Sequence, residues 1–416
     1  MLRLVYYEIR KNYLRGYVLA AIFLFVVLNA CIIYRGYLNG DGLMGYFMPH
    51  SSETRVEWDF YHRMHKQLDG PLTADKARFV NDEHERLGSL TADRTYSREQ
   101  QDDTYTGHVW NDYVMITKYF YEPMKYAAGY EKHINLTVEK ANENVVFYNK
   151  YNNNYEQAKN KYIQDHYGGR KIAVFYDGKP WELLFKYRFS DLLILLLLLL
   201  GLVPIYSNEK ETRMDDLILS SRKGKGSMSL AKLLSIFIYI AFLLLVFSSL
   251  NLLTFGALYR FSGAGMPIYS IEAYQYTPFP ISVLSFYMLL ILIKMAGFVV
   301  IGLWLGLLSA CFQRALYPYM LGVLLMVCGI YTSGYLTSVE MGKTVWAMLS
   351  PFTLLKGNEL LMELTGMNIG NMFVLRLAVC LVMQLTLSVL LYLAIRLFST
   401  SSKLSRRTMF PVKEGA

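Results

Sequence analysis

Two histidines stand at a spacing that could support metal chemistry. His62 and His65 lie three residues apart, so a helix would place both imidazoles on one face, with Asp59 one turn earlier. Imidazole and carboxylate groups can bind zinc, which takes four ligands, of which at least three come from the protein. Surface histidines at this spacing are frequent, and no further ligand follows at a fixed spacing. The sequence therefore favours a histidine pair without a metal.

Enzyme motifs are scarce elsewhere in the chain. The sequence contains no GxSxG, no HExxH and no GxGxxG that opens a helix. The stretch GKGS at residues 224–227 resembles a phosphate-binding loop, but it lacks the upstream glycine and the lysine position that such a loop needs. We therefore expect a chain that is not an enzyme and binds no cofactor. Any work driven by a nucleotide would depend on a separate ATPase.

The stretch YSNEKETRMDDLILSSRKGKGSMSLAKLL, residues 206–234, is highly charged and lies between two highly apolar segments. Its acidic residues come first and its basic residues last, which matches the dipole of a helix. Met214, Leu217 and Ile218 fall at helical spacing between them. The pattern predicts either a short amphipathic helix for a partner to bind or a solvated connector.

The flanking apolar segments indicate a membrane protein. Mean hydropathy is +0.23 and 54% of the residues are hydrophobic, in blocks rather than dispersed. A span needs roughly 20 mostly apolar residues and must be helical to satisfy its own backbone. The six candidates are residues 16–34, 189–206, 233–259, 283–312, 319–336 and 372–398.

Basic residues in the short loops predict the orientation, because cationic flanks stay in the cytoplasm. With the N-terminus inside, the cytoplasmic side receives the basic residues of 1–15, of 210–232 and of the tail. The two short outer loops hold only Arg260, Lys343 and Lys356. We expect both termini in the cytoplasm of a bacterial cell, and the net charge of +9 signals topology rather than nucleic-acid binding.

The four cysteines give no sign of a lipid anchor, a disulfide framework or a metal site. Residues 28–31 (LNAC) loosely resemble a lipoprotein cleavage site, but the apolar run is long and the asparagine atypical, so we expect the span to be retained. All four cysteines lie in predicted spans, which predicts neither a disulfide framework nor a CxxC metal site.

Residues 37–187 should fold in water as an extracellular domain, because they contain all seven histidines and half of the tyrosines. Helical patterns cover 51–68, 72–90 and 109–162, the second starting after Thr73 and ending at Gly88. Residues 171–185 (KIAVFYDGKPWELLF) predict a short β-hairpin turning at Asp177 and Gly178. The tyrosines in 113–162 predict the core and rim of a helical hairpin, with a ligand-binding face as the alternative.

The charged stretch resembles the cytoplasmic loop of type-2 ATP-binding-cassette (ABC) permeases. The matching positions are Glu209, Leu217, Leu219, Ser220, Arg222 and Lys232. Arg213 departs from the pattern, since the family usually has glycine there. The six-span layout, the basic amphipathic start, the large outer insert and LSPFTLL in the last outer loop extend the resemblance over most of the chain.

The resemblance implies an all-α membrane protein: a permease subunit that binds ATPase subunits and a second permease chain, with ATP and magnesium held by the ATPase. The coupling residues would be Glu209, Glu211, Asp215, Asp216, Leu217, Leu219 and Arg222. It implies an interface helix (1–15), a first span (16–36), the extracellular domain (37–187), a five-span region (188–398) with its coupling loop (207–232), and a basic tail (399–416). Residues 345–366 would dip into the outer leaflet.

Lys294 lies near the middle of the fourth predicted span, where a charge is costly and usually faces a cavity or a partner. We expect Lys294 at the pore or the subunit interface, with a structural pair or a snorkelling side chain as the alternative. The spans show no deep acidic residue, so we expect its counterion to be a lipid, a substrate or the other subunit. Asn251 and Gln384 are the other polar residues of a thin polar path.

Two functions remain open. The first is an ABC exporter for a peptide, lipid-like or antibiotic substrate. The second is a relay that transports nothing, in which the ATPase moves the extracellular domain or the domain senses a ligand.

Overall fold

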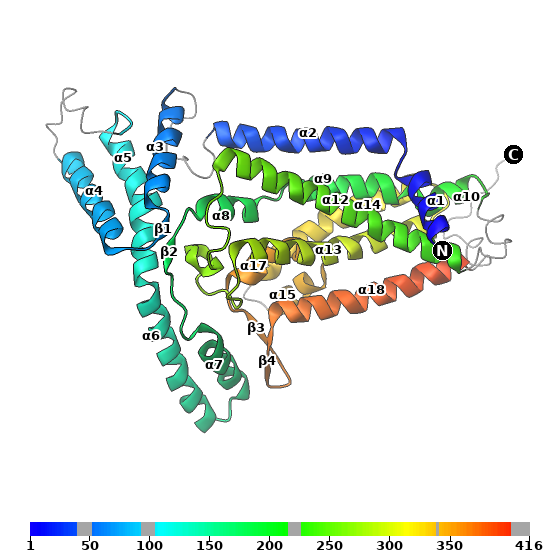
Figure 1. The fold of residues 1–416 in the computed structure, drawn as a ribbon. Helices are drawn as coiled ribbons and strands as arrows, with labels where there is room; N and C mark the ends of the chain where they lie inside the picture. Colours follow the sequence, from blue (N-terminus) through cyan, green and yellow to red (C-terminus); the bar gives the residue numbers. More distant parts are fainter. Residues whose placement is uncertain (40–51, 93–104, 215–225, 338–340, 401–416) are drawn as a thin grey trace.

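The computed structural model describes residues 1–39, 52–92, 105–214, 226–337 and 341–400. It consists of a long bundle of apolar helices with a separate group of helices at one end (Figure 1). The N-terminal helix α1 (Leu2–Asn12) lies at the opposite end of the bundle, close to the end of the last helix. A hydrogen bond of 3.1 Å between Ser229 and Ser399 joins the first turn of one span to the last turn of another.

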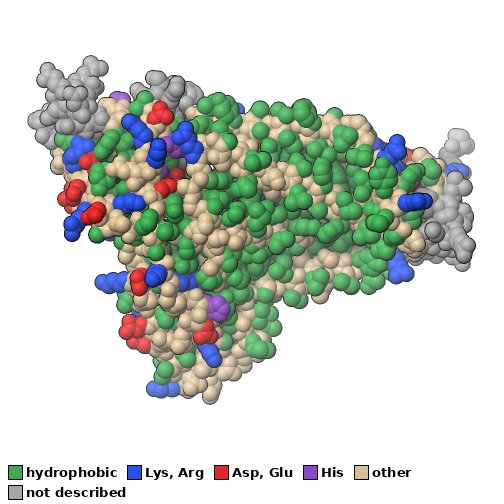
Figure 2. Space-filling view, in the orientation of Figure 1, with side chains coloured by type: hydrophobic (Ala, Val, Ile, Leu, Met, Phe, Trp, Pro, Cys, Tyr) green, Lys and Arg blue, Asp and Glu red, His purple; other side chains and the backbone are tan. Residues whose placement is uncertain are grey.

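The described residues include six helical segments long and apolar enough to cross a membrane, which confirms the predicted number of spans. They are α2 (Gly16–Leu38), the run Lys179–Glu211, α12 (Ser227–Tyr259), α13 (Val283–Cys311), α14 (Leu316–Ser333) and α18 (Arg376–Thr400). The second segment comprises α8 (Lys179–Lys186), α9 (Phe189–Leu202) and α10 (Pro204–Glu211). Hydrophobic side chains cover the visible face of the bundle, and charged ones gather at its two ends and on the helices beyond (Figure 2).

Close helix packing in the bundle depends on small residues. A Cβ atom on Gly302 of α13 would lie 2.6 Å from Cδ1 of Ile240 on α12. A larger residue at this position would require the end of the Ile240 side chain to move.

The helices outside the bundle form the extramembrane domain, which comprises most of residues 52–178. Its helices are α3 (Ser52–Leu68), α4 (Ala74–Ala92), α5 (Val109–Ile116), α6 (Glu122–Lys150) and α7 (Asn154–Tyr167). A π-helical turn, η2 (Thr117–Tyr121), joins α5 to α6 in one rod (Figure 1). The predicted end of the second helix at Gly88 is wrong: α4 continues to Ala92, and Gly88 lies within the helix beside the Tyr113 ring.

The predicted hairpin at Asp177 and Gly178 is also wrong. β2 (Val174–Phe175) pairs antiparallel with β1 (Gly70–Pro71), and the residues after Gly178 form α8. Pro180 in the first turn of α8 favours a helix start, which outweighs the turn signal. The small hairpin of this fold is β3 (Gly366–Ile369) with β4 (Met372–Leu375), immediately before α18.

Between α14 and α18 the chain forms short elements: η5 (Gly334–Thr337), α15 (Met341–Leu349), α16 (Phe352–Leu355) and α17 (Gly357–Met362). Phe352, Leu354 and Leu361 are buried, so this segment packs into the end of the bundle beside α13. Such broken helices are compatible with the predicted re-entrant segment, because their backbone is covered by protein.

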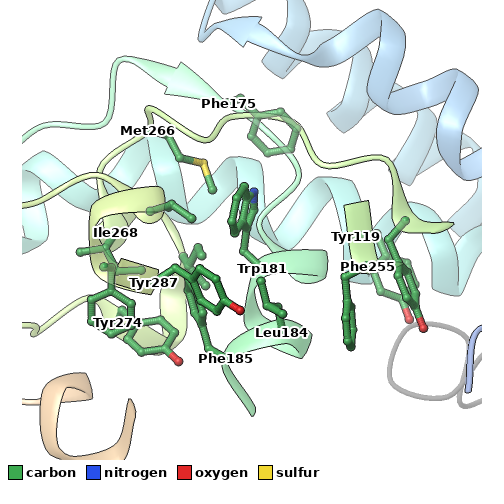
Figure 3. Packing of buried hydrophobic residues seen from close by; sticks show 14 of the residues in the cluster. Tyr119, Phe175, Trp181, Leu184, Phe185, Phe255, Met266, Ile268, Tyr274 and Tyr287 are labelled. Carbon is green, nitrogen blue, oxygen red and sulfur yellow. The ribbon is translucent and has the colours of Figure 1, made fainter. Parts of the chain in front are cut away.

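One hydrophobic core runs from the extramembrane domain into the bundle. Trp181 and Phe185 of α8 lie at its centre, surrounded by Met266 and Ile268 from the segment between α12 and α13 and by Tyr287 of α13 (Figure 3). Trp181 also donates a hydrogen bond of 2.8 Å from Nε1 to the Ser262 carbonyl oxygen. The continuous core indicates that the domain and this end of the bundle form one packed unit.

Candidate functional site

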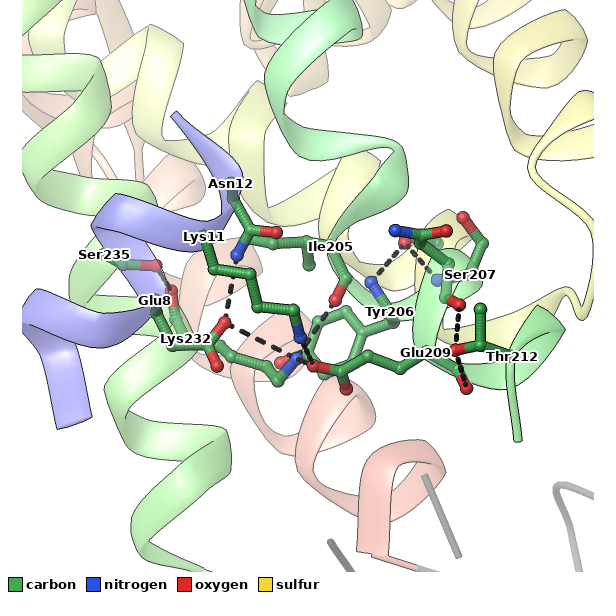
Figure 4. A network of polar contacts seen from close by, with 12 residues as sticks. Glu8, Lys11, Asn12, Ile205, Tyr206, Ser207, Glu209, Thr212, Lys232 and Ser235 are labelled. Carbon is green, nitrogen blue, oxygen red and sulfur yellow. Dashed lines mark hydrogen bonds and ion pairs between the residues drawn. The ribbon is translucent and has the colours of Figure 1, made fainter. Parts of the chain in front are cut away.

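The strongest candidate site is a buried cluster of charges at the end of the bundle where α1, α10 and α12 meet (Figure 4). We call it the ionic junction and define it as Glu8, Lys11, Asn12, Glu209 and Lys232. Glu209 and Lys232, both positions of the permease resemblance, lie at its centre. The undescribed residues 215–225 connect α10 to α12, so the junction lies at the base of the predicted coupling loop.

The path of the chain into the junction follows from Pro204. Proline cannot donate an intrahelical hydrogen bond, so a new helix, α10, begins there. The amides of Tyr206 and Ser207 lie in its first turn, and both donate to Oγ of Ser309 on α13, at 2.9 and 3.1 Å. Oγ of Ser309 in turn donates to the Val203 carbonyl oxygen at 2.6 Å. This buried hydroxyl fixes α10 and therefore the direction of Glu209.

Lys232 makes the central contacts of the ionic junction. Its Nζ lies 2.5 Å from Oε1 of Glu209 and 3.6 Å from Oε2 of Glu8. It also donates to the Ile205 carbonyl oxygen at 3.0 Å and lies 4.8 Å from the centre of the Tyr206 ring. Lys232, on α12, thus contacts both α1 and α10.

Residues of α1 complete the charge balance. Lys11 forms a second ion pair with Glu209, and Asn12 donates to Glu8 at 3.0 Å. The junction then holds two carboxylates and two ammonium groups. Glu8, Glu209 and Lys232 are at most 5% exposed, so each depends on its partners for compensation. Breaking one buried pair typically costs about 3–5 kcal/mol, because the remaining charge stays uncompensated.

The predicted coupling residues that the structure describes lie in different environments. Glu209 is buried in the junction and therefore holds helices together, whereas Glu211 is exposed at the end of α10. Asp215, Asp216, Leu217, Leu219 and Arg222 lie outside the described residues. The residues predicted to form an interface helix fold as α1, whose buried face carries Glu8 and Asn12 and packs on α12.

Lys294 finds its counterion within the chain, so the predicted external counterion is wrong. Its Nζ lies 2.8 and 3.0 Å from the two carboxylate oxygens of Asp191, in the first turn of α9. The sequence places Asp191 near the end of a span, where it should meet water. In the fold α8 precedes it and covers that end, so Asp191 is only 6% exposed. This ion pair is the structural alternative to a pore-facing lysine.

The other polar residues of the spans also have partners. Asn251 accepts from Nδ2 of Asn29 at 2.7 Å and donates to Ser190 at 2.9 Å. Gln384 donates to the carbonyl oxygens of Met348 and Leu349 at the end of α15. A cavity of about 20 Å³ beside Asp191 and Lys294 has room for one water molecule. These residues therefore join neighbouring segments of the bundle.

The histidine pair lies in the extramembrane domain, on α3. His65 contacts Asp69 at 3.1 Å, and its Nε2 lies 3.6 Å from Oδ2 of Asp177. Tyr61 donates a 2.6 Å hydrogen bond to the same carboxylate, and burial raises the pKa of Asp177 above its ordinary value. The described residues contain no cluster of three or more metal-ligating side chains. Asp177, which is predicted from the sequence to lie in a turn, is a buried partner of His65.

A further set of contacts connects the extramembrane domain to the segment between α12 and α13. Tyr126 donates to the Tyr269 carbonyl oxygen at 2.7 Å, and Tyr167 to that of Tyr276 at 2.6 Å. Arg170 donates to the Thr277 carbonyl oxygen at 3.0 Å. We call these contacts the tyrosine tether. The helical hairpin therefore uses its tyrosines for attachment as well as for its core, which spacing alone could not reveal.

Comparison with family models, with curated proteins and with solved structures finds no match. The resemblance to type-2 ABC permeases therefore stays a prediction from the sequence.

Proposed function

We propose that this chain is the membrane-spanning permease subunit of an ABC transporter. A separate ATPase would hydrolyse ATP with magnesium, and a second permease chain would complete the assembly. The cargo would be a peptide, a lipid-like compound or an antibiotic, moved outward across the cell membrane of a bacterium. The loop resemblance and the six apolar helices support this proposal.

The ionic junction is the observation on which the proposal depends. The loop that would bind the ATPase leaves the bundle after Glu211 and returns at Ser227. Just inside these points Glu209 and Lys232 join α10 to α12, and Lys11 and Glu8 join both to α1. A push on the loop would therefore displace two spans and the N-terminal helix together, as rigid-body transitions require.

Copurification tests the docking. The chain is expressed with the ATPase encoded by the neighbouring gene, and the double charge reversal Glu211→Lys with Asp215→Lys is compared with the unmodified chain. We expect the reversals to abolish copurification, because opposite charge at an interface is replaced by like charge. Glu131→Lys, at an exposed position of α6, is the matched control and should copurify normally. Copurification retained by the double reversal would contradict the docking.

The tyrosine tether favours a second candidate function, a relay that transports nothing. Hydrogen bonds from α6 and α7 hold the segment between α12 and α13. A second contact joins Tyr162 of α7 to Phe373 of the β3–β4 hairpin, with ring centres 5.8 Å apart. Movement of α12, α13 or α18 would therefore reach the extramembrane domain.

Spin labels distinguish the relay from a permease with a static domain. In a cysteine-free background, labels replace Val146 on α6 and Leu253 on α12, which are 60% and 71% exposed. The relay predicts that the distance between the labels changes when ATP is added to the complex with the ATPase. A distance that stays unchanged during ATP hydrolysis would contradict the relay, and the permease with a static domain would remain as the proposed function.

A further inference from the structure

A cavity of about 480 Å³ lies between the extramembrane domain and the segments that connect the spans. We call it the outer cleft. Its walls come from α6, from the residues around β2 and α8, and from the 3₁₀ turns η3 (Ile268–Ser270) and η4 (Glu272–Tyr274). Its volume falls within the range of sites for small molecules. A more open hollow of about 540 Å³ adjoins it and shares Glu122, Tyr126 and Glu272.

The charge of the outer cleft is predominantly negative. It is lined by five carboxylates, two lysines and one histidine. Lys179 is already paired with Glu182 at 3.0 Å, so it does not compensate the others. Among the described residues Glu122, Glu272 and Glu363 form no ion pair, and all three are exposed. The rim therefore presents three carboxylates without ion pairs among the described residues, from α6, from η4 and from the residue after α17.

The inner wall contains polar groups that are already desolvated. His65 is 7% exposed and Asp177 is 5% exposed, and both line the cavity. Nε2 of His65 is buried without a hydrogen-bond partner in the protein. It lies 3.6 Å from Oδ2 of Asp177, longer than a hydrogen bond, so His65 and Asp177 form a polar pair on the inner wall.

The remaining lining identifies the kind of ligand. Aromatic rings of Tyr119, Tyr126, Phe175, Tyr176 and Tyr276 stand among the carboxylates. Rings attract cations and also bury apolar surface. The carboxylates are dispersed over the walls, whereas a metal ion requires its ligands within about 2–2.6 Å.

We propose that the outer cleft binds a small organic cation, an amine carried on an apolar body. The ammonium group would lie between Glu122 on α6 and Glu272 on η4, with the apolar body against Tyr126 and the inner wall. This site is outside the membrane bundle and does not depend on ATPase docking, so it goes beyond the proposed function. A ligand here would bridge the extramembrane domain and the segment between α12 and α13.

Binding of three matched probes to the full-length chain in lipid nanodiscs tests the proposal. Phenylbutylamine, phenylbutanol and phenylbutyrate share one apolar body and differ in charge. By isothermal calorimetry we expect saturable binding of the amine, about tenfold or more tighter than the alcohol, and none of the anion. Raising the salt concentration should weaken the binding of the amine and leave that of the alcohol unchanged.

Variants assign the binding to the outer cleft. The double variant Glu122→Gln with Glu272→Gln should bind the amine about tenfold or more weakly and should bind the alcohol as the unmodified chain does. Both positions are exposed, and the unfolding temperature should stay that of the unmodified chain. Glu131→Gln, on α6 outside the cleft, is the control and should bind the amine normally. Unchanged binding of the amine in the double variant, no saturable binding up to about 10 mM, or preference for the anion would each overturn the proposal.

Discussion

Lys294 on α13 and Asp191 on α9 neutralise each other inside the bundle, with 2.8 Å between Nζ and Oδ2. The pair joins two spans that are far apart in the sequence. It lies beside the layer of Asn29, Ser190 and Asn251, so polar contacts connect α2, α9, α12 and α13 inside the bundle.

Replacing one partner of this pair should destabilise the bundle. We expect Lys294→Met or Asp191→Asn to cost about 3 kcal/mol, because a buried charge or an unsatisfied polar group remains. Lys294→Met combined with Asp191→Leu should recover most of the loss. Unfolding in mixed micelles measures all three. If Lys294→Met instead preserves stability but abolishes transport or assembly with the second chain, Lys294 acts at the pore or at the subunit interface.

The ionic junction leads to a similar prediction at the end of the bundle where α1, α10 and α12 meet. Lys232→Met should lose about 3–5 kcal/mol, because Glu209 and Glu8 then face each other without a central cation. Adding Glu209→Gln should restore part of the loss. A double-mutant cycle on unfolding free energies gives the coupling, for which we expect at least about 1 kcal/mol. Additive losses would show that the two side chains act independently.

The tyrosine tether should control the exchange of nearby amides. Tyr167→Phe removes the hydrogen bond to the Tyr276 carbonyl oxygen and should cost about 1 kcal/mol. Hydrogen–deuterium exchange in residues 268–282 should accelerate, while exchange in α14 should not change. Tyr151→Phe is the matched control, since Tyr151 is 69% exposed. Equal exchange in both variants would count against the tether.

His62 predicts acid sensitivity of the extramembrane domain. Burial, with Arg260 and His65 nearby, lowers the pKa of His62 to about 4 from its ordinary value, while Asp59 acts in the opposite direction. The unfolded chain then binds more protons than the folded chain between pH 6.5 and about 4. The contribution of neutral His62 to the free energy of unfolding is therefore complete above pH 6.5, and it is lost as the pH falls toward 4.

Comparison with a variant isolates the contribution of His62. His62→Gln should flatten the dependence of the unfolding temperature on pH over this interval. The difference between the two profiles removes the contribution of Asp177 and other buried carboxyl groups, which both proteins share. Parallel profiles would contradict the assignment to His62.

The spans could be predicted because a helix in lipid needs only length and low polarity, and both are local properties. The charged stretch between the second and third spans was also evident from its residues. What spacing could not reveal is which buried charges meet. Asp191 and Lys294 are adjacent only because α9 packs beside α13, and Lys232 reaches Glu8 only because α1 folds back onto α12.

The wrong hairpin has a similar physical origin. Asp177 and Gly178 have the local preference for a two-residue turn. Pro180 instead starts α8, and Val174 finds its partner near Gly70, a hundred residues earlier in the chain. Tertiary pairing over that distance outweighs a preference of one or two residues. The outer cleft, built from α6, β2 and η4, depends on the same long-range contacts and was equally hidden.

The rod of α5, η2 and α6 has a mechanical consequence. Tyr126 fastens it to the segment between α12 and α13, and the helix continues beyond that point to Lys150. At 1.5 Å per residue this arm is about 36 Å long. Tilting it by about 10° at its attachment would sweep its tip through about 6 Å. A small tilt at the attachment point therefore produces a larger movement at the distal end of the arm. A displacement too small to open a passage between spans would move that end by about the width of a side chain.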